Sequence, residues 1–216
     1  IKDFNDVEAE YENWFRKSKI LANKNVKKCV LIHNEACIHF DFVTRKLDSL
    51  KAQGKIDEWG ISIYSPALVP DILKSPGCEI VQLPYSILNP QPAMDAAMRT
   101  LHLHGKQVHA RSIFTQGLIF NKRNDGAEPK ELAEFRKQLL RYSEEKGIPV
   151  SAIAMQFINR SSWINKFLIG ADSADHLDDL ARVYDHAEDI KIIENLRSLA
   201  IKIPIDVVSP QTWGGQ

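Results

Sequence analysis

Polar side chains follow the short apolar runs of this sequence, and their types suit proton transfer and ligand binding. They are His33 and Asn34, Ser62, Gln82 and Ser86, Arg111 and Ser112, and Asp172 and Ser173. An imidazole such as that of His33 can polarise a substrate carbonyl or give it a proton. A single histidine after an apolar strand also fits a structural role. The position at the end of a strand favours the chemical role.

A metal site is a second possibility to weigh, because three histidines lie close together in the sequence. His102 and His104 lie two residues apart near the end of a predicted helix, on different faces, and His109 follows in the next strand. No cysteine pair has the spacing of a zinc site. We therefore expect surface histidines and no metal. No glycine-rich phosphate loop of the GxGxxG or GxxxxGK[ST] type is present either.

The elements that must position these residues alternate between strands and helices. The apolar runs are too short for ordinary helices and are rich in Val, Ile and Leu, which is typical of strands buried on both faces. They cover Lys27–Asn34, Glu58–Ser65, Glu79–Ser86, Lys106–Ser112 and Asn165–Ser173. Amphipathic segments between them predict helices over Asp41–Gln53, Pro66–Lys74, Gln91–His104, Pro129–Glu145 and Val150–Asn159.

Repeated strand and helix predict βαβ units and a parallel sheet. In a (β/α)8 barrel the reactive groups come from the carboxyl ends of several strands, as they do here. We therefore predict an α/β fold, a (β/α)8 TIM barrel that is incomplete in this chain, with about five of the eight βα units. Residues 1–216 are predicted to form one barrel domain that lacks its first strands. Because the chain begins with Ile1, we expect either processing or further residues upstream.

Composition excludes several classes of protein. The chain has 28 basic and 28 acidic residues and a formal net charge of zero, which argues against a nucleic-acid or anionic-membrane binder. Its three cysteines cannot all pair, and no apolar run approaches the roughly 20 residues that cross a bilayer. The N-terminal residues lack the pattern of a signal peptide. We expect a soluble, cytoplasmic protein.

Taken in order, six segments resemble the aldo-keto reductase family. They are VLIHN, LDSLKAQGKIDEWGISIYS, EIVQLPYSILNPQ, GKQVHARSIFTQGLIF, IPVSAIAMQFI and FLIGADSADHLDDL, and the resemblance extends from Val7 to about Tyr184. It implies a (β/α)8 barrel that binds NADP(H) or NAD(H) in extended form without a Rossmann motif. It further implies hydride transfer to a carbonyl, with a tyrosine as proton donor assisted by a lysine, an aspartate and a histidine.

The resemblance assigns the nicotinamide end of the cofactor site residue by residue. His33 matches the catalytic histidine, and Ser62 and Gln82 match residues that hold the carboxamide. Ile63 stands where the family has an asparagine, so half of that clamp is missing. Arg111 stands where a tyrosine often stacks on the nicotinamide, and a guanidinium can also stack. The residues that match the loop around the pyrophosphate are Ser112, Phe114, Gln116 and Gly117.

The adenosine end departs further from the family pattern. Gly170, Ser173 and His176 match cofactor-binding positions, but Gly170 replaces a frequent lysine and His176 a frequent arginine. Leu180 replaces a frequent asparagine. Acidic side chains surround the same turn, at Asp172, Asp175, Asp178 and Asp179. Carboxylates repel a 2′-phosphate and can accept from a free ribose hydroxyl, so NADP(H) and NAD(H) both stay open. The acidic run is equally consistent with a solvated first helical turn.

The resemblance therefore implies an NAD(P)H-dependent oxidoreductase that reduces a small-molecule carbonyl, such as an aldehyde, ketone or sugar-like substrate. The family's aspartate, tyrosine and lysine lie upstream of the histidine strand, and they have no matching place among these 216 residues. We accordingly expect this chain alone to be inactive. We expect an enzyme only if an upstream segment supplies the aspartate, the tyrosine and the lysine.

The alternative is a non-catalytic, nucleotide-binding or regulatory relative, which Ile63, Arg111 and Leu180 favour. A phosphate-binding barrel isomerase or aldolase is a third, less favoured hypothesis, because IGADS offers one glycine.

Overall fold

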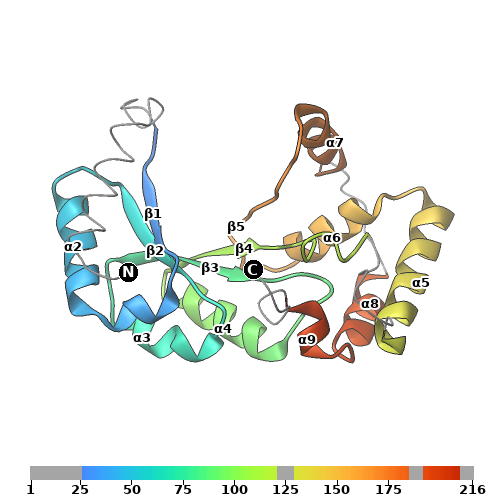
Figure 1. Cartoon of the computed structure of the whole chain (residues 1–216), viewed down its shortest axis with the longest axis horizontal. Coiled ribbons are helices and arrows are strands. Elements are labelled where there is room, and N and C mark those ends of the chain that lie inside the picture. The colour runs from blue at the N-terminus through green and yellow to red at the C-terminus, as the bar shows by residue number, and fades with distance from the viewer. Residues whose placement is uncertain (1–25, 121–128, 185–191, 210–216) are drawn as a thin grey trace. The chain divides into compact units, whose positions relative to one another are not determined.

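The computed structural model describes residues 26–120, 129–184 and 192–209. Each predicted strand run overlaps an observed strand (Figure 1). The strands are β1 (Cys29–Ile32), β2 (Glu58–Ser62), β3 (Cys78–Pro84), β4 (Gln107–Arg111) and β5 (Lys166–Phe167). The helices are η1 (Glu35–His39), α2 (Asp41–Ala52), η2 (Pro66–Leu68), α3 (Val69–Leu73), α4 (Pro92–Leu103), α5 (Lys130–Lys146), α6 (Val150–Asn159), α7 (Ala174–Tyr184), α8 (Ile193–Ala200) and α9 (Ile205–Val208).

The strands follow one another in the sheet in the order β1-β2-β3-β4-β5. β1 and β2 run parallel, with Ile32 opposite Ile61, and β4 and β5 run parallel, with His109 opposite Lys166. Strands that are neighbours in both sequence and space, joined by helices, are the succession of βαβ units that the pattern predicts. The chain divides into two compact units, residues 1–81 and 82–216. The prediction of a single domain stays a prediction.

The core of the first unit lies around β2, all five residues of which are buried. Trp59 is fully buried, and its indole Nε1 donates to Asp48 Oδ1 of α2 at 2.8 Å. Gly60 is required on this strand because a Cβ there would lie 2.0 Å from the carbonyl oxygen of Ile80 in β3. β1 is less buried than the pattern predicts, since Cys29 is exposed and Val30 and Leu31 are half-buried. It is the first strand in the order of the described strands, so one of its sides has no described neighbour.

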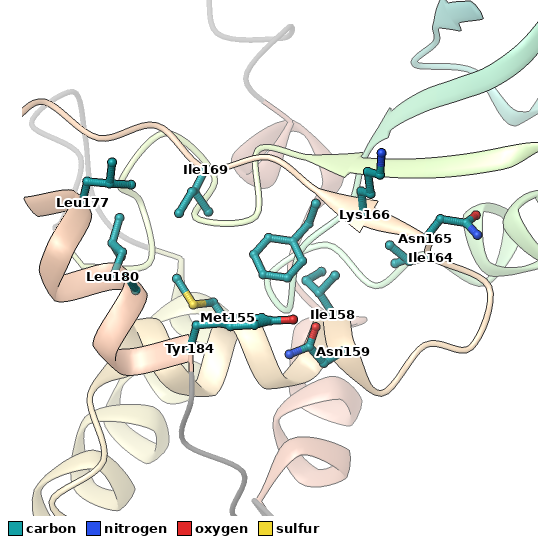
Figure 2. Close-up of a pocket in the computed structure, with 12 residues that line it drawn as sticks. Met155, Ile158, Asn159, Ile164, Asn165, Lys166, Ile169, Leu177, Leu180 and Tyr184 are labelled. Carbon is teal, nitrogen blue, oxygen red and sulfur yellow. The ribbon is translucent and has the colours of Figure 1, made fainter. Parts of the chain in front are cut away.

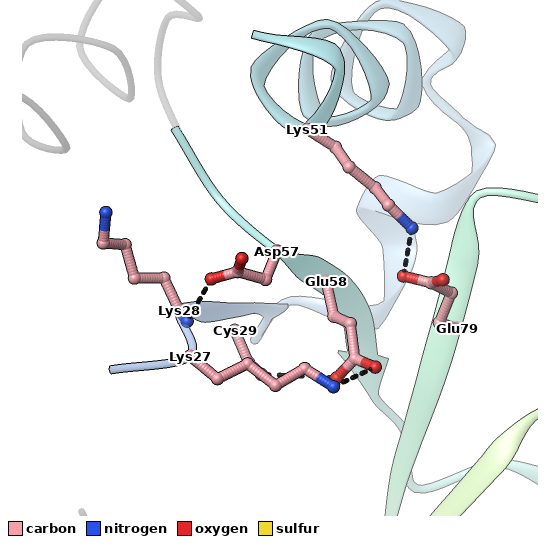
Figure 3. A network of polar contacts seen from close by, with 7 residues as sticks. All are labelled: Lys27, Lys28, Cys29, Lys51, Asp57, Glu58 and Glu79. Atoms are coloured by element: carbon pink, nitrogen blue, oxygen red, sulfur yellow. Dashed lines mark hydrogen bonds and ion pairs between the residues drawn. The ribbon is translucent and has the colours of Figure 1, made fainter. Parts of the chain in front are cut away.

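Charged side chains join the strands of this unit at their amino ends (Figure 3). Lys27 Nζ lies 2.5 Å from Glu58 Oε1, and this carboxylate raises the pKa of Lys27. The backbone N–H of Lys28 donates to Asp57 Oδ2 at 2.6 Å, and Lys51 Nζ of α2 lies 2.6 Å from Glu79 Oε2 of β3. These contacts lie at the ends of β1 and β2 opposite to His33 and Ser62.

One predicted helix differs from the structure. The segment over Pro66–Lys74 divides into η2 and α3. Pro70 lies in the first turn of α3, and a proline has no N–H with which to continue a helix from the preceding turn. Ser65 begins the segment as predicted, because its side chain accepts from the Ala67 N–H at 3.3 Å.

The second unit packs apolar faces of α4, α5 and α6 around β3 and β4. Its fully buried side chains include Leu83, Met98, Leu101, Val108, Phe135 and Leu139. β5 is only two residues long, whereas the pattern predicts a longer strand. Asn165 Oδ1 accepts from the Val108 N–H at 2.8 Å and Leu168 N–H donates to Ala110 O at 2.8 Å, after which the chain leaves β4. None of the described helices is long and apolar enough to cross a membrane.

Candidate functional site

The carboxyl ends of β1 and β2 bring two predicted site residues to one edge of the first unit. His33 directly follows β1, and Ser62 is the last residue of β2. Ile32 is paired with Ile61 in the parallel register, and His33 and Ser62 are the residues that follow this last pair on the two strands. His33 is exposed, whereas Ser62 is only 5% exposed. An accessible imidazole here can donate a hydrogen bond to a bound carbonyl oxygen.

One acidic and one amide side chain close to His33 in the sequence form hydrogen bonds at the same edge. Glu35 Oε2 accepts from the backbone N–H of Tyr64 at 2.6 Å and of Ser65 at 3.4 Å, so it joins the segments that follow β1 and β2. Asn34 Oδ1 accepts from the Ala36 N–H at 3.2 Å and begins η1. Glu35 was not among the predicted site residues. It could have been suggested by its position, because it is a carboxylate two residues after a histidine at the end of a strand. Ile63, beyond Ser62, is fully buried.

In the second unit, the ends of three strands meet. Arg111 is the last residue of β4, and its carbonyl accepts from the Tyr85 N–H just after β3 at 3.1 Å. The Leu168 bond to Ala110 brings the segment after β5 to the same edge. Gln82 lies within β3 and is half-buried. Arg111 is also half-buried, and its Nη1 donates to Ser112 Oγ at 3.5 Å.

The loop after β4 has an unusual backbone. Ser112, Thr115 and Gln116 have φ values of 55°, 49° and 51°, and Gly117 has φ 81°. For a residue with a side chain, this left-handed region costs on the order of 1–2 kcal/mol. Gly117 suits it, because glycine has no Cβ. The loop contains the predicted residues Ser112, Phe114, Gln116 and Gly117.

Buried hydrogen bonds hold this loop and the residue that follows it. Ser86 Oγ and Thr115 Oγ1 are 2.9 Å apart, and both residues are buried. The buried guanidinium of Arg136 on α5 donates to the Leu118 carbonyl. Thr115 and Arg136 were not among the predicted site residues. The signal for Arg136 was its place on the apolar face of its helix, beside Leu132, Phe135 and Leu139.

The turn between β5 and α7 contains the three predicted residues of the adenosine end. Ser173 Oγ accepts from the His176 N–H at 3.1 Å, as a helix N-cap does. His176 Nδ1 accepts from the Asp172 N–H at 3.4 Å. Gly170, Ser173 and His176 are exposed, as are the four aspartates around them. The turn therefore presents negative charge to solvent.

A cavity of about 610 Å³ lies beside this turn (Figure 2). Leu177, Leu180 and Tyr184 of α7 form one side, and Met155, Ile158 and Asn159 of α6 lie across from them. The rings of Phe167 and Tyr184, which also line it, have centroids 5.8 Å apart. Its lining is mainly apolar and includes none of the predicted site residues.

The histidines considered as metal ligands have other contacts. The His102 ring lies edge-on to Trp163, with centroids 5.6 Å apart, and His104 Nδ1 is 2.8 Å from Thr100 O. Within residues 26–120, 129–184 and 192–209, no group of three or more His, Cys, Asp or Glu residues is placed to hold a metal ion.

Comparison with known proteins gives both a family and a fold. The model of the Aldo/keto reductase family matches residues 13–201. An aldo-keto reductase from Bacillus halodurans in its apo form has a TM-score of 0.73 and 18% identity over 90% of this chain and 67% of its own. The glycerol dehydrogenase of Gluconobacter oxydans has a TM-score of 0.69 and 17% identity over 94% of this chain and 64% of its own. A thermostable aldo-keto reductase in complex with the inhibitor epalrestat has a TM-score of 0.68, with 18% identity over 90% and 66%.

These likenesses confirm the predicted fold class, a (β/α)8 barrel of which the structure contains five strands. The chain spans about two thirds of the length of the solved structures that it matches. Among curated proteins, none matches this chain significantly.

Proposed function

We propose, from the premise that this chain belongs to the aldo/keto reductase family, that it acts in hydride transfer between a nicotinamide cofactor and the carbonyl group of a small molecule. In such a reaction the cofactor supplies the hydride, and the protein binds, orients and polarises. The observation that supports the proposal is the position of His33, which is exposed and directly follows β1, whose last residue Ile32 pairs with Ile61, the residue before Ser62 in the neighbouring parallel strand.

His33 is proposed to donate a hydrogen bond to the substrate carbonyl oxygen, which gains negative charge as the hydride arrives. Glu35 supports this role by holding the segments after β1 and β2 together through two backbone amides. Ser62 and Gln82 are proposed to hold the nicotinamide carboxamide, with Arg111 against the ring. The left-handed loop of Ser112, Phe114, Gln116 and Gly117 is proposed to bind the pyrophosphate, and Gly170, Ser173 and His176 the adenosine.

Proton donation needs a group that these residues do not supply in the family arrangement. Tyr85 is unsuited to it, because it is 3% exposed and its hydroxyl is bonded to Asp95 and Arg197. Burial, followed by the Asp95 hydrogen bond, raises the pKa of Tyr85, so it keeps its proton. We therefore propose that these 216 residues alone bind nucleotide without turning over a carbonyl.

A second candidate is a non-catalytic family member that binds nucleotide in a regulatory role. Ile63 favours it, since a fully buried apolar side chain follows Ser62 where the family pattern has an amide. In this case the nucleotide would bind without carbonyl-dependent oxidation.

The test uses the full-length protein, reduced NAD and NADP, and a panel of aldehydes, ketones and sugars. Fluorescence titration measures binding, and loss of nicotinamide absorbance measures turnover. We expect binding, turnover of at least one carbonyl, and a fall of roughly 100-fold or more in kcat for His33→Gln. His104→Gln, at an exposed helix end, is the matched control and should leave kcat unchanged. Binding with no turnover would favour the second candidate, and no binding of either nucleotide would contradict both.

A cytoplasmic location is proposed on the state of the cysteines. Cys29, Cys37 and Cys78 are thiols and form no disulfide, which suits a reducing compartment.

A further inference from the structure

We propose that Ser86 and Thr115 are positioning residues, whose buried hydroxyl pair sets the conformation of the loop at residues 112–117 and thereby the affinity for the nucleotide. This inference rests on the proposed function for the link to affinity. Its structural half, that the pair determines the shape of the loop, depends only on the contacts of the second unit.

The loop needs an external constraint. Ser112, Thr115 and Gln116 all lie in the left-handed region, and none of them is the glycine or asparagine that adopts it most readily. The local turns are present, with Thr115 N–H donating to Ser112 O at 2.8 Å and Gly117 N–H to Phe114 O at 3.0 Å. Such turns are available to many loops whose backbone stays in ordinary regions. Backbone strain of this type persists where the surroundings over-determine it, and it concentrates at functional sites.

The Ser86–Thr115 pair supplies such a constraint at the strained residue itself. The two hydroxyl oxygens are 2.9 Å apart, with Ser86 3% and Thr115 2% exposed. Ser86 is held in turn, because its carbonyl accepts from the Asn89 N–H at 3.0 Å, and the Tyr85 N–H before it donates to Arg111 O at 3.1 Å. Thr115 is thus bonded to a segment that is fixed against the end of β4.

A second anchor holds the far end of the loop. The buried Arg136 side chain reaches from α5 to the Leu118 carbonyl, and the Leu118 N–H donates to Thr115 O at 3.0 Å. The loop is therefore fixed at Thr115 and just beyond Gly117, while Gln116 between them is exposed. Both hydroxyls are too buried to touch a bound ligand, so any effect on affinity must act through the backbone.

The test compares Thr115→Val with Thr115→Ser in the full-length protein. Valine keeps the β-branched shape and removes the hydroxyl, and serine keeps the hydroxyl. Hydrogen exchange of the amides at positions 115, 117 and 118 is measured without nucleotide, and NADH and NADPH dissociation constants are measured by fluorescence. For Thr115→Val we expect exchange and the dissociation constant to rise by about tenfold, the effect of one buried hydrogen bond. Thr115→Ser should stay within about twofold of the wild type.

Two further variants separate positioning from loss of stability. Ser86→Ala should reproduce Thr115→Val, and the double variant should add little to either, because both remove one interaction. Ser143→Ala is the matched control in the same unit. Its hydroxyl donates to Ile148 O at 2.7 Å, so its loss lowers stability without touching the loop. It should leave loop exchange and nucleotide affinity unchanged.

Wild-type exchange at the loop amides in Thr115→Val would overturn the inference. So would faster exchange with unchanged affinity, because the loop shape would then not govern binding. If the wild-type protein binds neither nucleotide, the proposed function fails and the link to affinity fails with it. The exchange measurement still decides whether the hydroxyl pair sets the shape of the loop.

Discussion

The Tyr85 hydroxyl lies at the centre of a charged cluster in the second unit. It donates to Asp95 Oδ1 and accepts from Arg197 Nη1 at 3.3 Å, and Arg197 Nη2 also bonds Asp95 Oδ2. The ring stacks on Phe157 with centroids 5.3 Å apart. Tyr85, Asp95 of α4 and Arg197 of α8 thus tie three separate segments together. Burial raises the pKa of Tyr85 most, because it disfavours the charged tyrosinate. The Asp95 carboxylate raises it further, because it accepts the hydrogen bond of the neutral hydroxyl and repels a negative charge beside it.

This shift predicts a pH dependence of stability. The folded chain holds the Tyr85 proton more tightly than the unfolded chain, whose tyrosines titrate near about pH 10. The stabilising contribution is therefore complete below about pH 10 and is lost as the pH rises above it, at up to about 1.4 kcal/mol per pH unit. We expect the free energy of unfolding in urea to fall over this range in the wild type and to fall less steeply in Tyr85→Phe.

Tyr184→Phe is the control for this measurement, because Tyr184 is 49% exposed. It should keep the wild-type pH profile. An equal slope in Tyr85→Phe and wild type would show that the cluster does not hold the proton.

The location of a single residue in the fold was predictable where it followed from the residue's position along a strand. His33 and Ser62 are placed at strand ends by the apolar pattern alone. The roles of Thr115 and Ser86 were not accessible, because a left-handed φ and a hydrogen bond between two loops depend on tertiary packing. Glu35 acts through backbone amides 29 and 30 residues away, which no local pattern encodes.

At the scale of elements, β2 and β3 approach closely at Gly60. A Cβ there would lie 2.0 Å from the Ile80 carbonyl oxygen, and a backbone atom in a strand cannot move aside easily. We expect Gly60→Ala to lower the free energy of unfolding by about 1–3 kcal/mol, as overpacking does. Chemical unfolding would measure this loss. Gly170→Ala is the matched control, because nothing lies within 4 Å of a Cβ at that position. Equal stabilities of the two variants would contradict the close approach.

The first turns of α7 predict a preference between nucleotides, if the proposed adenosine position is correct. Asp172, Asp175, Asp178 and Asp179 are exposed, and Arg182 Nη1 already bonds Asp179 Oδ1 at 3.2 Å. Their charge repels a 2′-phosphate, so we expect NADH to bind more tightly than NADPH. A ratio of about fivefold corresponds to the roughly 1 kcal/mol typical of exposed charges.

Titration of both nucleotides at low and high salt measures this preference. Asp175→Asn with Asp178→Asn should narrow the ratio, and salt should narrow it too, because exposed charges are screened. Equal affinities for NADH and NADPH at low salt would contradict the proposal that the aspartates lie near the bound nucleotide.

Element types were predictable because the period of apolar residues differs between strands and helices. Four helices lie close to their predicted ranges, four strands lie within their predicted runs, and β3 begins one residue before its run, at Cys78. Two features were not predicted. The division of the helix at Pro70 depends on one missing N–H, and the shortness of β5 depends on where the chain leaves β4. Neither α8 nor α9 was predicted from the apolar pattern.

At the scale of the whole molecule, equal numbers of acidic and basic residues give a formal net charge of zero. A protein without a basic excess gains little from releasing the counterions of a polyanion. We expect the protein to pass through heparin and DNA columns at physiological salt. A variant with lysine at positions 175, 178 and 179 is the positive control and should be retained longer. Salt-dependent retention of the wild type would indicate a basic surface.

The fold class was predictable from the order of motifs, because helices between parallel strands leave few topologies. The division into two compact units was not, since it depends on tertiary contacts within each unit. The proposed nucleotide site was predictable in part. Its residues were assigned by family resemblance, and the unusual backbone of its proposed pyrophosphate loop emerges only from the structure.

Every residue from 170 to 179 is exposed, although this stretch directly follows a strand of the sheet. Apart from Leu177, which lines the cavity, replacing the side chains there removes little packing. A protein engineer who wishes to alter how the proposed adenosine end recognises its ligand could therefore vary these exposed side chains, a few residues from the carboxyl end of β5, with little change to the core of the described residues.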